Sequence, residues 1–256
     1  MPKVALITGS TSGIGLGVAE HFAQNGYAIM FHGLEVNGAQ IAAELGAKYQ
    51  VATSFSNANL LKPEAIAELV NETVSQLGRL DVLINNAGIQ YVAPLTDFPG
   101  SKYENIIAIN MNASFYASKA AWPHMEKQGF GRIINIASVH GLRASAFKTA
   151  YVAAKHGVLG MTKVMALEGA NKNINCNAIC PGYVKTPLVE GQIADQAKSH
   201  GLSEDEVVTE VMLKKQAVKQ FVPITAIADM ALLLAKDGSE TITGTTFTLD
   251  GGWTAQ

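Results

Sequence analysis

Ser138, Tyr151 and Lys155 are the residues whose types and spacing most clearly predict chemistry. Tyr151 and Lys155 are four residues apart, so on a helix both side chains lie on one face. A lysine ammonium beside a phenol favours the phenolate and lowers the tyrosine pKa, which suits a tyrosine to general acid/base catalysis. Ser138 ends an apolar, β-rich run and could donate a hydrogen bond to the same reacting oxygen. The three residues together predict proton transfer at a substrate oxygen.

A glycine-rich turn near the N-terminus predicts a nucleotide site. A short apolar strand leads into the turn Gly9-Ser-Thr-Ser-Gly13-Ile-Gly15, and a helix-like run follows it. Strand, glycine turn and helix form a dinucleotide site when the glycines let the backbone approach the pyrophosphate at the helix N-terminus. Three residues separate the first two glycines, which departs from the usual spacing. An ordinary connection between strand and helix is therefore the alternative.

Alternating strand-like and helix-like segments must position these residues. The predicted strands are residues 3–8, 27–31, 50–55, 80–84, 132–137, 174–180 and 245–249. The predicted helices are residues 14–24, 36–45, 63–77, about 103–128 and 150–170. The alternation predicts one α/β domain over residues 1–256, with a Rossmann-like, doubly wound parallel sheet and helices on both faces. A polar insertion of helical pattern occupies residues 183–222.

The composition narrows the classes of partner and compartment. The 256-residue chain is 48% hydrophobic and has a net charge of −2, which gives no electrostatic case for nucleic acid or an anionic membrane. No signal peptide or membrane-spanning apolar run is evident, so we expect a cytoplasmic protein. Cys176 and Cys180 fall in one predicted strand, roughly 13 Å apart. That separation fits neither a disulfide nor a two-thiolate metal site, so two buried thiols and no metal are expected.

Three further motifs follow predicted elements at positions where ligands bind in open α/β sheets. Asn85-Asn86-Ala87-Gly88 follows the fourth strand, and Pro181-Gly182 follows the sixth. Asn110 lies on a helical segment. Each has an ordinary alternative: an Asn-Gly turn, a strand terminator and a surface or capping asparagine, respectively.

Taken in order, these motifs resemble the short-chain dehydrogenase/reductase family over essentially the whole chain. The resemblance implies a catalytic tetrad of Asn110, Ser138, Tyr151 and Lys155. In it, Tyr151 exchanges the proton, Lys155 holds the nicotinamide ribose and Ser138 polarises the substrate oxygen. Asn110 would anchor a water in the proton relay. The implied cofactor residues are Gly9, Thr11, Ser12, Gly13, Ile14, Gly15, Gly33, Leu34, Asn59, Leu60, Asn86, Ala87, Gly88, Tyr151, Lys155, Pro181, Gly182, Val184 and Thr186.

A closer resemblance, to bacterial D-3-hydroxybutyrate dehydrogenases, implies the substrate. It rests on segments such as Gly88-Ile-Gln90, Thr186-Pro-Leu-Val-Glu-Gly-Gln192 and the ending Leu249-Asp-Gly-Gly-Trp253. The residues implied to hold the substrate carboxylate are Gln90, His140, Lys148 and Gln192, with Tyr183 and Trp253 beside the substrate. A small carboxylate that loses its water needs several hydrogen-bond donors and at least one cation, and this set of residues would provide both. Alternatively, Lys148 is a solvated surface lysine and His140 merely a loop residue.

Three departures from the family pattern bear on specificity. Gly33 stands where many NAD-using members have an aspartate that binds the ribose 2′-hydroxyl and repels a 2′-phosphate. No arginine or lysine lies at residues 9–15 or 31–35 to hold that phosphate, so NAD is still the expected cofactor. Asn59 replaces an adenine-contacting aspartate, and Tyr183 replaces a frequent tryptophan. Tyr183 would alter the pocket around the substrate methyl group.

The resemblance also implies an oligomer and a substrate lid. The predicted helix at residues 150–168 is nearly apolar all round, which favours a second burying surface. The resemblance implies a homotetramer built partly on this helix. The insertion at residues 183–222 resembles the family's substrate lid. Two other functions stay open: an NADPH-dependent 3-oxoacyl-thioester reductase, and a non-catalytic NAD-sensing regulator. The first would need cations for the 2′-phosphate, and the second would carry a broken tetrad.

Overall fold

A computed structural model describes residues 1–187, 189–191, 193, 197 and 201–255 of the chain. In that part, seven parallel strands form one sheet in the order β3-β2-β1-β4-β5-β6-β7. The strands are β1 (Val4–Ile7), β2 (Ala28–His32), β3 (Thr53–Ser56), β4 (Val82–Asn85), β5 (Gly131–Ile136), β6 (Ile174–Pro181) and β7 (Thr246–Leu249). The order reverses direction between β1 and β4, which is the switch point where ligands bind in doubly wound sheets.

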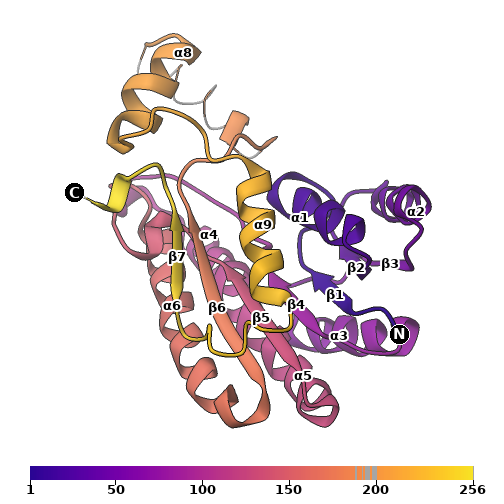
Figure 1. Ribbon diagram of the computed structural model, residues 1–256. Coiled ribbons are helices and arrows are strands. Elements are labelled where there is room, and N and C mark those ends of the chain that lie inside the picture. The colour runs from indigo at the N-terminus through magenta and orange to yellow at the C-terminus, as the bar shows by residue number, and fades with distance from the viewer. Residues whose placement is uncertain (188, 192, 194–196, 198–200, 256) are drawn as a thin grey trace.

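Helices cover both faces of this sheet (Figure 1). The longer helices are α1 (Gly13–Gln24), α2 (Gly38–Tyr49), α3 (Pro63–Leu77), α4 (Gly100–Ile107), α5 (Ala113–Gln128), α6 (Thr149–Gly169) and α9 (Ile224–Ala235). Apolar residues of α1 and α9 form one core with the strands, and those of α3 and α5 form another. The central strands are buried along their whole length because both faces are covered. The predicted fold class is therefore confirmed.

Local sequence signals explain where the helices begin and end. Pro63 occupies the first turn of α3, where its missing N–H costs nothing, and Gly78 ends that helix in a left-handed conformation. α2 runs to Tyr49, past the predicted end at residue 45, and Gln50 takes the left-handed conformation that ends it. The third strand consequently begins at Thr53, later than predicted.

The predicted helix at about residues 103–128 is divided in the structure. A π-helical turn, η2 (Ala108–Asn112), separates α4 from α5 and contains Asn110. Such turns widen a helix locally and occur mostly at functional sites. A regular apolar period cannot reveal the extra residue, so the sequence predicted one helix.

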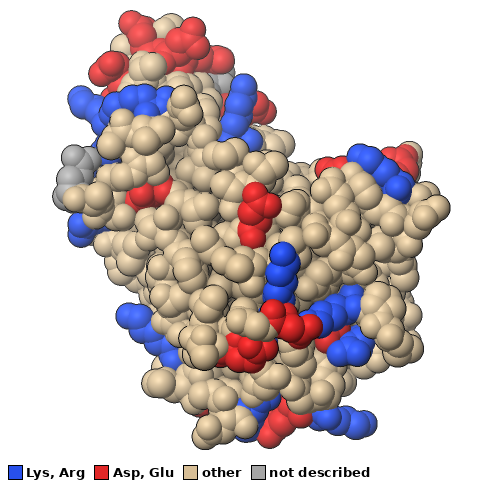
Figure 2. All heavy atoms as spheres, viewed as in Figure 1, with Lys and Arg blue, Asp and Glu red and all other residues tan. Residues whose placement is uncertain are grey.

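The predicted lid region is only partly described. It includes the short helix α8 (Glu204–Glu206), a second π-helical turn η5 (Val207–Met212) and the 3₁₀ turn η6 (Leu213–Lys215). In Figure 1 this segment stands beyond the end of β6, above the body of the molecule. Figure 2 shows acidic side chains gathered at its tip and mixed charges over the rest of this face. None of the helices that the structure describes is long and apolar enough to cross a membrane.

Candidate active site

The glycine-rich turn follows β1 at the switch point, and its glycines are required by the backbone. Gly9 and Gly13 have φ angles of +64° and +54°, which side chains rarely permit. A Cβ on Gly15 would overlap the Gly9 carbonyl, so α1 can begin this close to β1 only with a glycine there. The turn therefore leaves backbone N–H groups at the N-terminus of α1 open to an anionic group.

The motif after β4 holds this turn in place. The Thr8 hydroxyl accepts hydrogen bonds from the backbone N–H groups of Asn86 and Ala87, at 3.0 and 3.1 Å. The Asn86 side chain donates to the carbonyls of Thr8 and Gly9, at 2.9 and 3.0 Å. The alternative of a plain Asn-Gly turn is wrong, because this asparagine joins two strands across the switch point.

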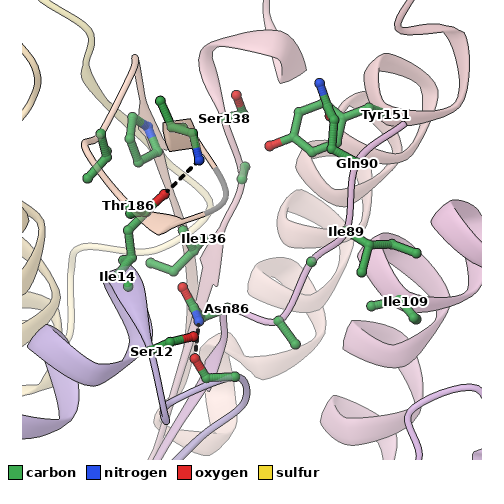
Figure 3. Close-up of a pocket in the computed structure, with 18 of the residues that line it drawn as sticks. Ser12, Ile14, Asn86, Ile89, Gln90, Ile109, Ile136, Ser138, Tyr151 and Thr186 are labelled. Carbon is green, nitrogen blue, oxygen red and sulfur yellow. Dashed lines mark hydrogen bonds between the residues drawn. The ribbon is translucent and has the colours of Figure 1, made fainter. Parts of the chain in front are cut away.

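One cavity of about 420 Å³ runs from the end of β2 to the C-terminal segment. Figure 3 shows Ser12, Ile14 and Asn86 on one part of its wall and Gln90, Ser138 and Tyr151 on another. Most predicted site residues line it: Gly9, Ser12, Gly13, Ile14, Gly33, Leu34, Asn59, Leu60, Asn86, Ala87, Gly88, Gln90, Ser138, His140, Lys148, Tyr151, Lys155, Pro181, Gly182, Tyr183, Val184, Thr186 and Trp253. Thr11, Gly15 and Asn110 do not line it, and Gln192 lies outside the described residues.

Glu35 also lines this cavity and is a residue that the sequence analysis missed. Its carboxylate accepts hydrogen bonds from the Thr11 hydroxyl and, at 3.2 Å, from the Ser12 hydroxyl. These two bonds help to lower the pKa of Glu35 although burial opposes them, so the group is anionic. A Cβ on Gly33 would collide with both Thr11 and this carboxylate. Gly33 thus makes room for an acidic group that arrives from two residues further along the chain.

His32 ties the glycine turn to the opposite wall. Its Nδ1 accepts a hydrogen bond from the Gly9 N–H at 3.1 Å, and its Nε2 lies 2.9 Å from the Ala58 carbonyl. Burial lowers the pKa of His32, which keeps the ring neutral and lets Nδ1 act as an acceptor. Nearby, the Asn59 side-chain oxygen accepts from the Leu61 N–H at 3.0 Å, so this asparagine closes a local turn.

Tyr151 and Lys155 lie on one face of α6, as their spacing predicted. The Lys155 ammonium is 5.7 Å from the centre of the Tyr151 ring and donates to the Ile136 carbonyl at 2.8 Å. Burial raises the pKa of Tyr151 to about 12, although the Ser138 hydroxyl opposes this rise. Burial likewise lowers the pKa of Lys155 to about 8. In the protein alone the pKa of Tyr151 is therefore raised and not lowered as predicted, because the loss of water dominates.

Asn110 is fully buried and is neither a surface nor a capping residue. Its side-chain oxygen accepts from the Ile89 N–H at 2.8 Å, and its side-chain nitrogen donates to the Ile89 carbonyl at 2.9 Å. The π-helical turn places it there. In the structure its amide holds the loop that carries Gly88 and Gln90, a positional role that the sequence did not suggest.

Lys148 precedes α6 and points into the cavity, with only 7% of its surface exposed. Its ammonium lies 3.5 Å from the Tyr183 hydroxyl and 5.5 Å from the centre of the Tyr183 ring. Burial lowers the pKa of Lys148 to about 8, and Lys215 adds to this effect. The alternative of a solvated surface lysine is wrong.

Aromatic rings enclose this end of the cavity. Tyr183 stacks on Trp253 with ring centres 5.9 Å apart, and Lys215 lies 5.4 Å from the centre of the Trp253 ring. Among the described residues, the Gln90 side-chain oxygen is buried without a hydrogen-bond partner. A small molecule bound here would therefore meet the Lys148 ammonium, the unsatisfied Gln90 amide and the aromatic rings of Tyr183 and Trp253. No group of three or more His, Cys, Asp or Glu side chains within the described ranges could hold a metal ion.

Comparisons with known proteins agree with this architecture. The profile of the short chain dehydrogenase family matches residues 3–197. D-beta-hydroxybutyrate dehydrogenases from Rhizobium meliloti and Cupriavidus necator are 47% and 42% identical to the chain, which aligns over 100% and 99% of its length and 100% and 98% of theirs. A solved structure of actinorhodin polyketide ketoreductase with NADPH is 29% identical, with a TM-score of 0.93 over 98% of this chain and 97% of that one.

Proposed function

The chain belongs to the short chain dehydrogenase family, and on that basis we propose that it oxidises D-3-hydroxybutyrate to acetoacetate, reversibly and with NAD. The observation that carries the substrate assignment is Lys148, a cation buried beside Tyr183 in the same cavity as Ser138 and Tyr151. Among the residues that the structure describes, the Lys148 ammonium has Tyr183 but no carboxylate as a partner. Burying an ammonium in this way is costly, and a bound carboxylate would supply the acidic partner. The two curated relatives named above support the same substrate.

The cavity fits a nicotinamide dinucleotide. The glycine turn at the N-terminus of α1 suits a pyrophosphate, and the cavity continues from there in both directions. The adenosine end would be held by Leu34, Asn59 and Leu60. The nicotinamide end would be held by Ile14, Val184 and Thr186. When bound, the oxidised nicotinamide ring supplies the hydride-accepting carbon and a positive charge.

The chain's own residues would then move the proton. Tyr151 accepts the hydroxyl proton of the substrate, and the Ser138 hydroxyl donates a hydrogen bond to the same oxygen. Lys155 binds the nicotinamide ribose and, with the positive charge of the ring, favours the phenolate of Tyr151 over the protonated form that burial favours. Asn110 holds the loop of Gly88 and Gln90, and a water in the proton relay would bind near it.

Glu35 supports NAD over NADP. Its carboxylate lies beside Thr11 and Ser12, where it could accept a hydrogen bond from a ribose 2′-hydroxyl. A 2′-phosphate would meet a negative charge at that place instead of a cation. This feature disfavours the NADPH-dependent thioester reductase, although the structural relative above was solved with NADPH. The intact set of Ser138, Tyr151 and Lys155 in one cavity disfavours a non-catalytic regulator.

Replacement of Lys148 tests the substrate class. A hydrogen bond to a charged group is worth about 1.5–3 kcal/mol, so Lys148→Ala should lower kcat/KM for D-3-hydroxybutyrate roughly ten- to 150-fold. Gln90→Ala should lower it less, because it removes a neutral donor. NADH affinity should be unchanged, and poor turnover of the neutral alcohol butan-2-ol should be nearly unaffected.

The matched control is Lys163→Ala, which removes an exposed lysine from α6, the helix that Lys148 precedes. This variant should leave kcat/KM unchanged for both substrates. Equal losses for the acid and the neutral alcohol in Lys148→Ala would mean that Lys148 only shapes the site. No loss for either substrate would remove the physical basis of the carboxylate assignment.

A further inference from the structure

The ring of His32, at the end of β2, joins two loops that line one part of the cavity. Its Nδ1 accepts a hydrogen bond from the Gly9 N–H at 3.1 Å, and its Nε2 lies 2.9 Å from the Ala58 carbonyl. Gly9 opens the glycine turn after β1, and Ala58 lies in the loop at residues 57–62 between β3 and α3. Because β2 lies between β1 and β3 in the sheet, the ring connects the walls on either side of its own strand.

The two partners fix where the proton of this ring must be. A backbone N–H can only donate a hydrogen bond, and a backbone carbonyl can only accept one. Nδ1 of His32 must therefore be unprotonated, and the proton of the neutral ring must lie on Nε2, where it points to Ala58. A second proton on Nδ1 would face the Gly9 N–H. The link between the two loops consequently requires the neutral ring.

Backbone bonds hold His32 itself in place. The Ser10 N–H donates to the His32 carbonyl at 2.7 Å, and the His32 N–H donates to the Ser10 hydroxyl at 2.9 Å. His32 is 3% exposed and Ser10 is fully buried. These bonds do not depend on the imidazole, so replacement of the ring should free the two loops from each other without detaching β2 from the turn.

The surroundings of the ring favour its neutral form. Burial lowers the pKa of His32 from its ordinary value of 6.5, although the Ala58 carbonyl and the Glu35 carboxylate oppose this effect. Glu35, in the loop after β2, is the charged group that acts on the ring. The segments packed around it, residues 8–12, 53–61 and 85–88, contain no titratable side chain. The ring is therefore neutral at pH 7 and becomes protonated only as the pH falls below 6.5.

We propose that His32 is a positioning residue for the cofactor: its neutral ring sets the spacing between the glycine turn and the loop at residues 57–62, and thereby the affinity for the adenosine half of the dinucleotide. Asn59 and Leu60, which follow Ala58, belong to the proposed adenosine site. This inference rests on the proposed dinucleotide cofactor but not on the substrate. Since Ser138 and Tyr151 lie on another part of the cavity wall (Figure 3), proton transfer should not need the ring.

Binding of ADP-ribose, which contains the adenosine half without the nicotinamide, tests the proposal. His32→Leu removes both ring hydrogen bonds and keeps a side chain of similar size. It should weaken ADP-ribose and NADH binding by the same factor, roughly five- to 100-fold, the usual worth of two neutral hydrogen bonds. In steady-state assays the loss should appear in KM for NAD, while kcat at saturating NAD should not fall.

A conservative variant separates positioning from a general loss of structure. The side-chain oxygen of asparagine falls near the histidine Nδ1 position, so His32→Asn can still accept from the Gly9 N–H but no longer reaches Ala58. It should recover part of the ADP-ribose affinity that His32→Leu loses. The matched control is His124→Leu in α5, a histidine whose contact with Asn71 is exposed, and it should leave ADP-ribose binding unchanged. Thermal unfolding of each variant shows whether it is folded.

The pH dependence provides a second readout, because asparagine does not titrate. The ADP-ribose affinity of the wild type relative to that of His32→Asn should be level between pH 8 and 6.5. It should then fall toward about pH 5, since the protonated ring can no longer accept from Gly9. The titration of Glu35 and Lys155 occurs in both proteins and cancels. Circular dichroism at each pH confirms that both remain folded.

The proposal is overturned if His32→Leu binds ADP-ribose as the wild type does, if its kcat falls as much as its affinity, or if His32→Asn recovers none of the loss. A relative affinity that stays level or rises on acidification also overturns it, and a rise would assign a protonated ring to the pyrophosphate. Failure of the proposed substrate appears separately, as wild-type enzyme that binds ADP-ribose but does not oxidise D-3-hydroxybutyrate. Wild-type enzyme that binds only 2′-phospho-ADP-ribose would refute the choice of NAD, and the same variants are then compared with that compound.

Discussion

At the scale of single residues, burial controls proton affinity in this site more strongly than neighbouring charge does. It raises the pKa of Tyr151 to about 12 and lowers that of Lys148 to about 8. The sequence could predict that Tyr151 and Lys155 share a helix face, because that depends only on spacing. It could not predict their pKa values, which depend on how many strands and loops exclude water from the cavity.

Lys148 should make substrate binding dependent on pH. Its pKa in the protein is lowered to about 8, so it is protonated below that pH and loses its charge as the pH rises through it. The ratio of kcat/KM for D-3-hydroxybutyrate to that for butan-2-ol should be flat below pH 8. Above it, the ratio should fall by about tenfold per pH unit, because the titration of Tyr151 affects both substrates and cancels.

Lys148→Arg provides the comparison, since a guanidinium stays protonated over this range. Its ratio should remain level where that of the wild type declines. A wild-type ratio that is independent of pH up to pH 10 would show that Lys148 does not bind the carboxylate.

Glu35 should determine the choice of cofactor. Glu35→Gln removes the negative charge beside Thr11 and Ser12 but keeps the shape of the side chain. The ratio of kcat/KM with NADP to that with NAD should rise roughly ten- to 100-fold, because a 2′-phosphate no longer meets a carboxylate. Glu44→Gln, on the exposed side of α2, should leave the ratio unchanged. An unchanged ratio in Glu35→Gln would mean that another residue excludes NADP.

Glu35 also shows why the residue type at position 33 alone was not enough to predict the cofactor. The expectation for NAD rested on the lack of cations and was weakened by Gly33. The acidic group comes from two residues later and reaches back past Gly33 to Thr11. The sequence does place a glutamate two residues after Gly33. Only the geometry of the loop after β2 shows that the Glu35 side chain enters the cavity.

At the scale of elements, the π-helical turn between α4 and α5 links the helix layer to the substrate loop. Asn110→Ala removes both hydrogen bonds to the Ile89 backbone and leaves these partly buried groups without the Asn110 amide as a partner. We expect the free energy of unfolding to fall by about 1–3 kcal/mol and kcat/KM to fall with it, as Gln90 loses its position. Urea denaturation and initial rates measure the two effects.

Asn112→Ala, an exposed change in the same turn, is the control and should alter neither quantity. If Asn110→Ala lowers activity without any change in stability, Asn110 acts directly on the reaction and its bonds to Ile89 are incidental.

The elements themselves were largely predictable. Strands and helices alternate with strong apolar periods, so their existence, their order and the parallel sheet followed from the sequence. The π-helical turns and the late start of β3 were not predictable, because they depend on a single inserted residue and on the left-handed conformation at Gln50. Cys176 and Cys180 are free, buried thiols in β6, as expected from their spacing.

At the scale of the whole molecule, one cavity at the sheet edge is lined by residues from both ends of the chain, from Gly9 to Trp253. Asp250 accepts from the Gly252 and Thr254 backbone N–H groups, at 2.9 and 2.8 Å, and so places Trp253 against Tyr183 and His140. The homotetramer stays a prediction. Val164 and Leu167 of α6 are 54% and 81% exposed in the single chain, which is consistent with a further partner surface on that helix.

The most direct test of the central proposal is the initial rate of NAD reduction by the wild-type enzyme with each enantiomer of 3-hydroxybutyrate, with Tyr151→Phe as the inactive control. We predict rapid reduction with the D enantiomer, the substrate of the relatives named above, and little with the L enantiomer. If Lys148 holds the carboxylate and Ser138 and Tyr151 hold the hydroxyl, only one enantiomer would point its C–H bond toward the nicotinamide. Tyr151→Phe should bind NADH normally and reduce no NAD. Equal rates with both enantiomers, no rate with the D enantiomer, or substantial turnover by Tyr151→Phe would contradict the proposal.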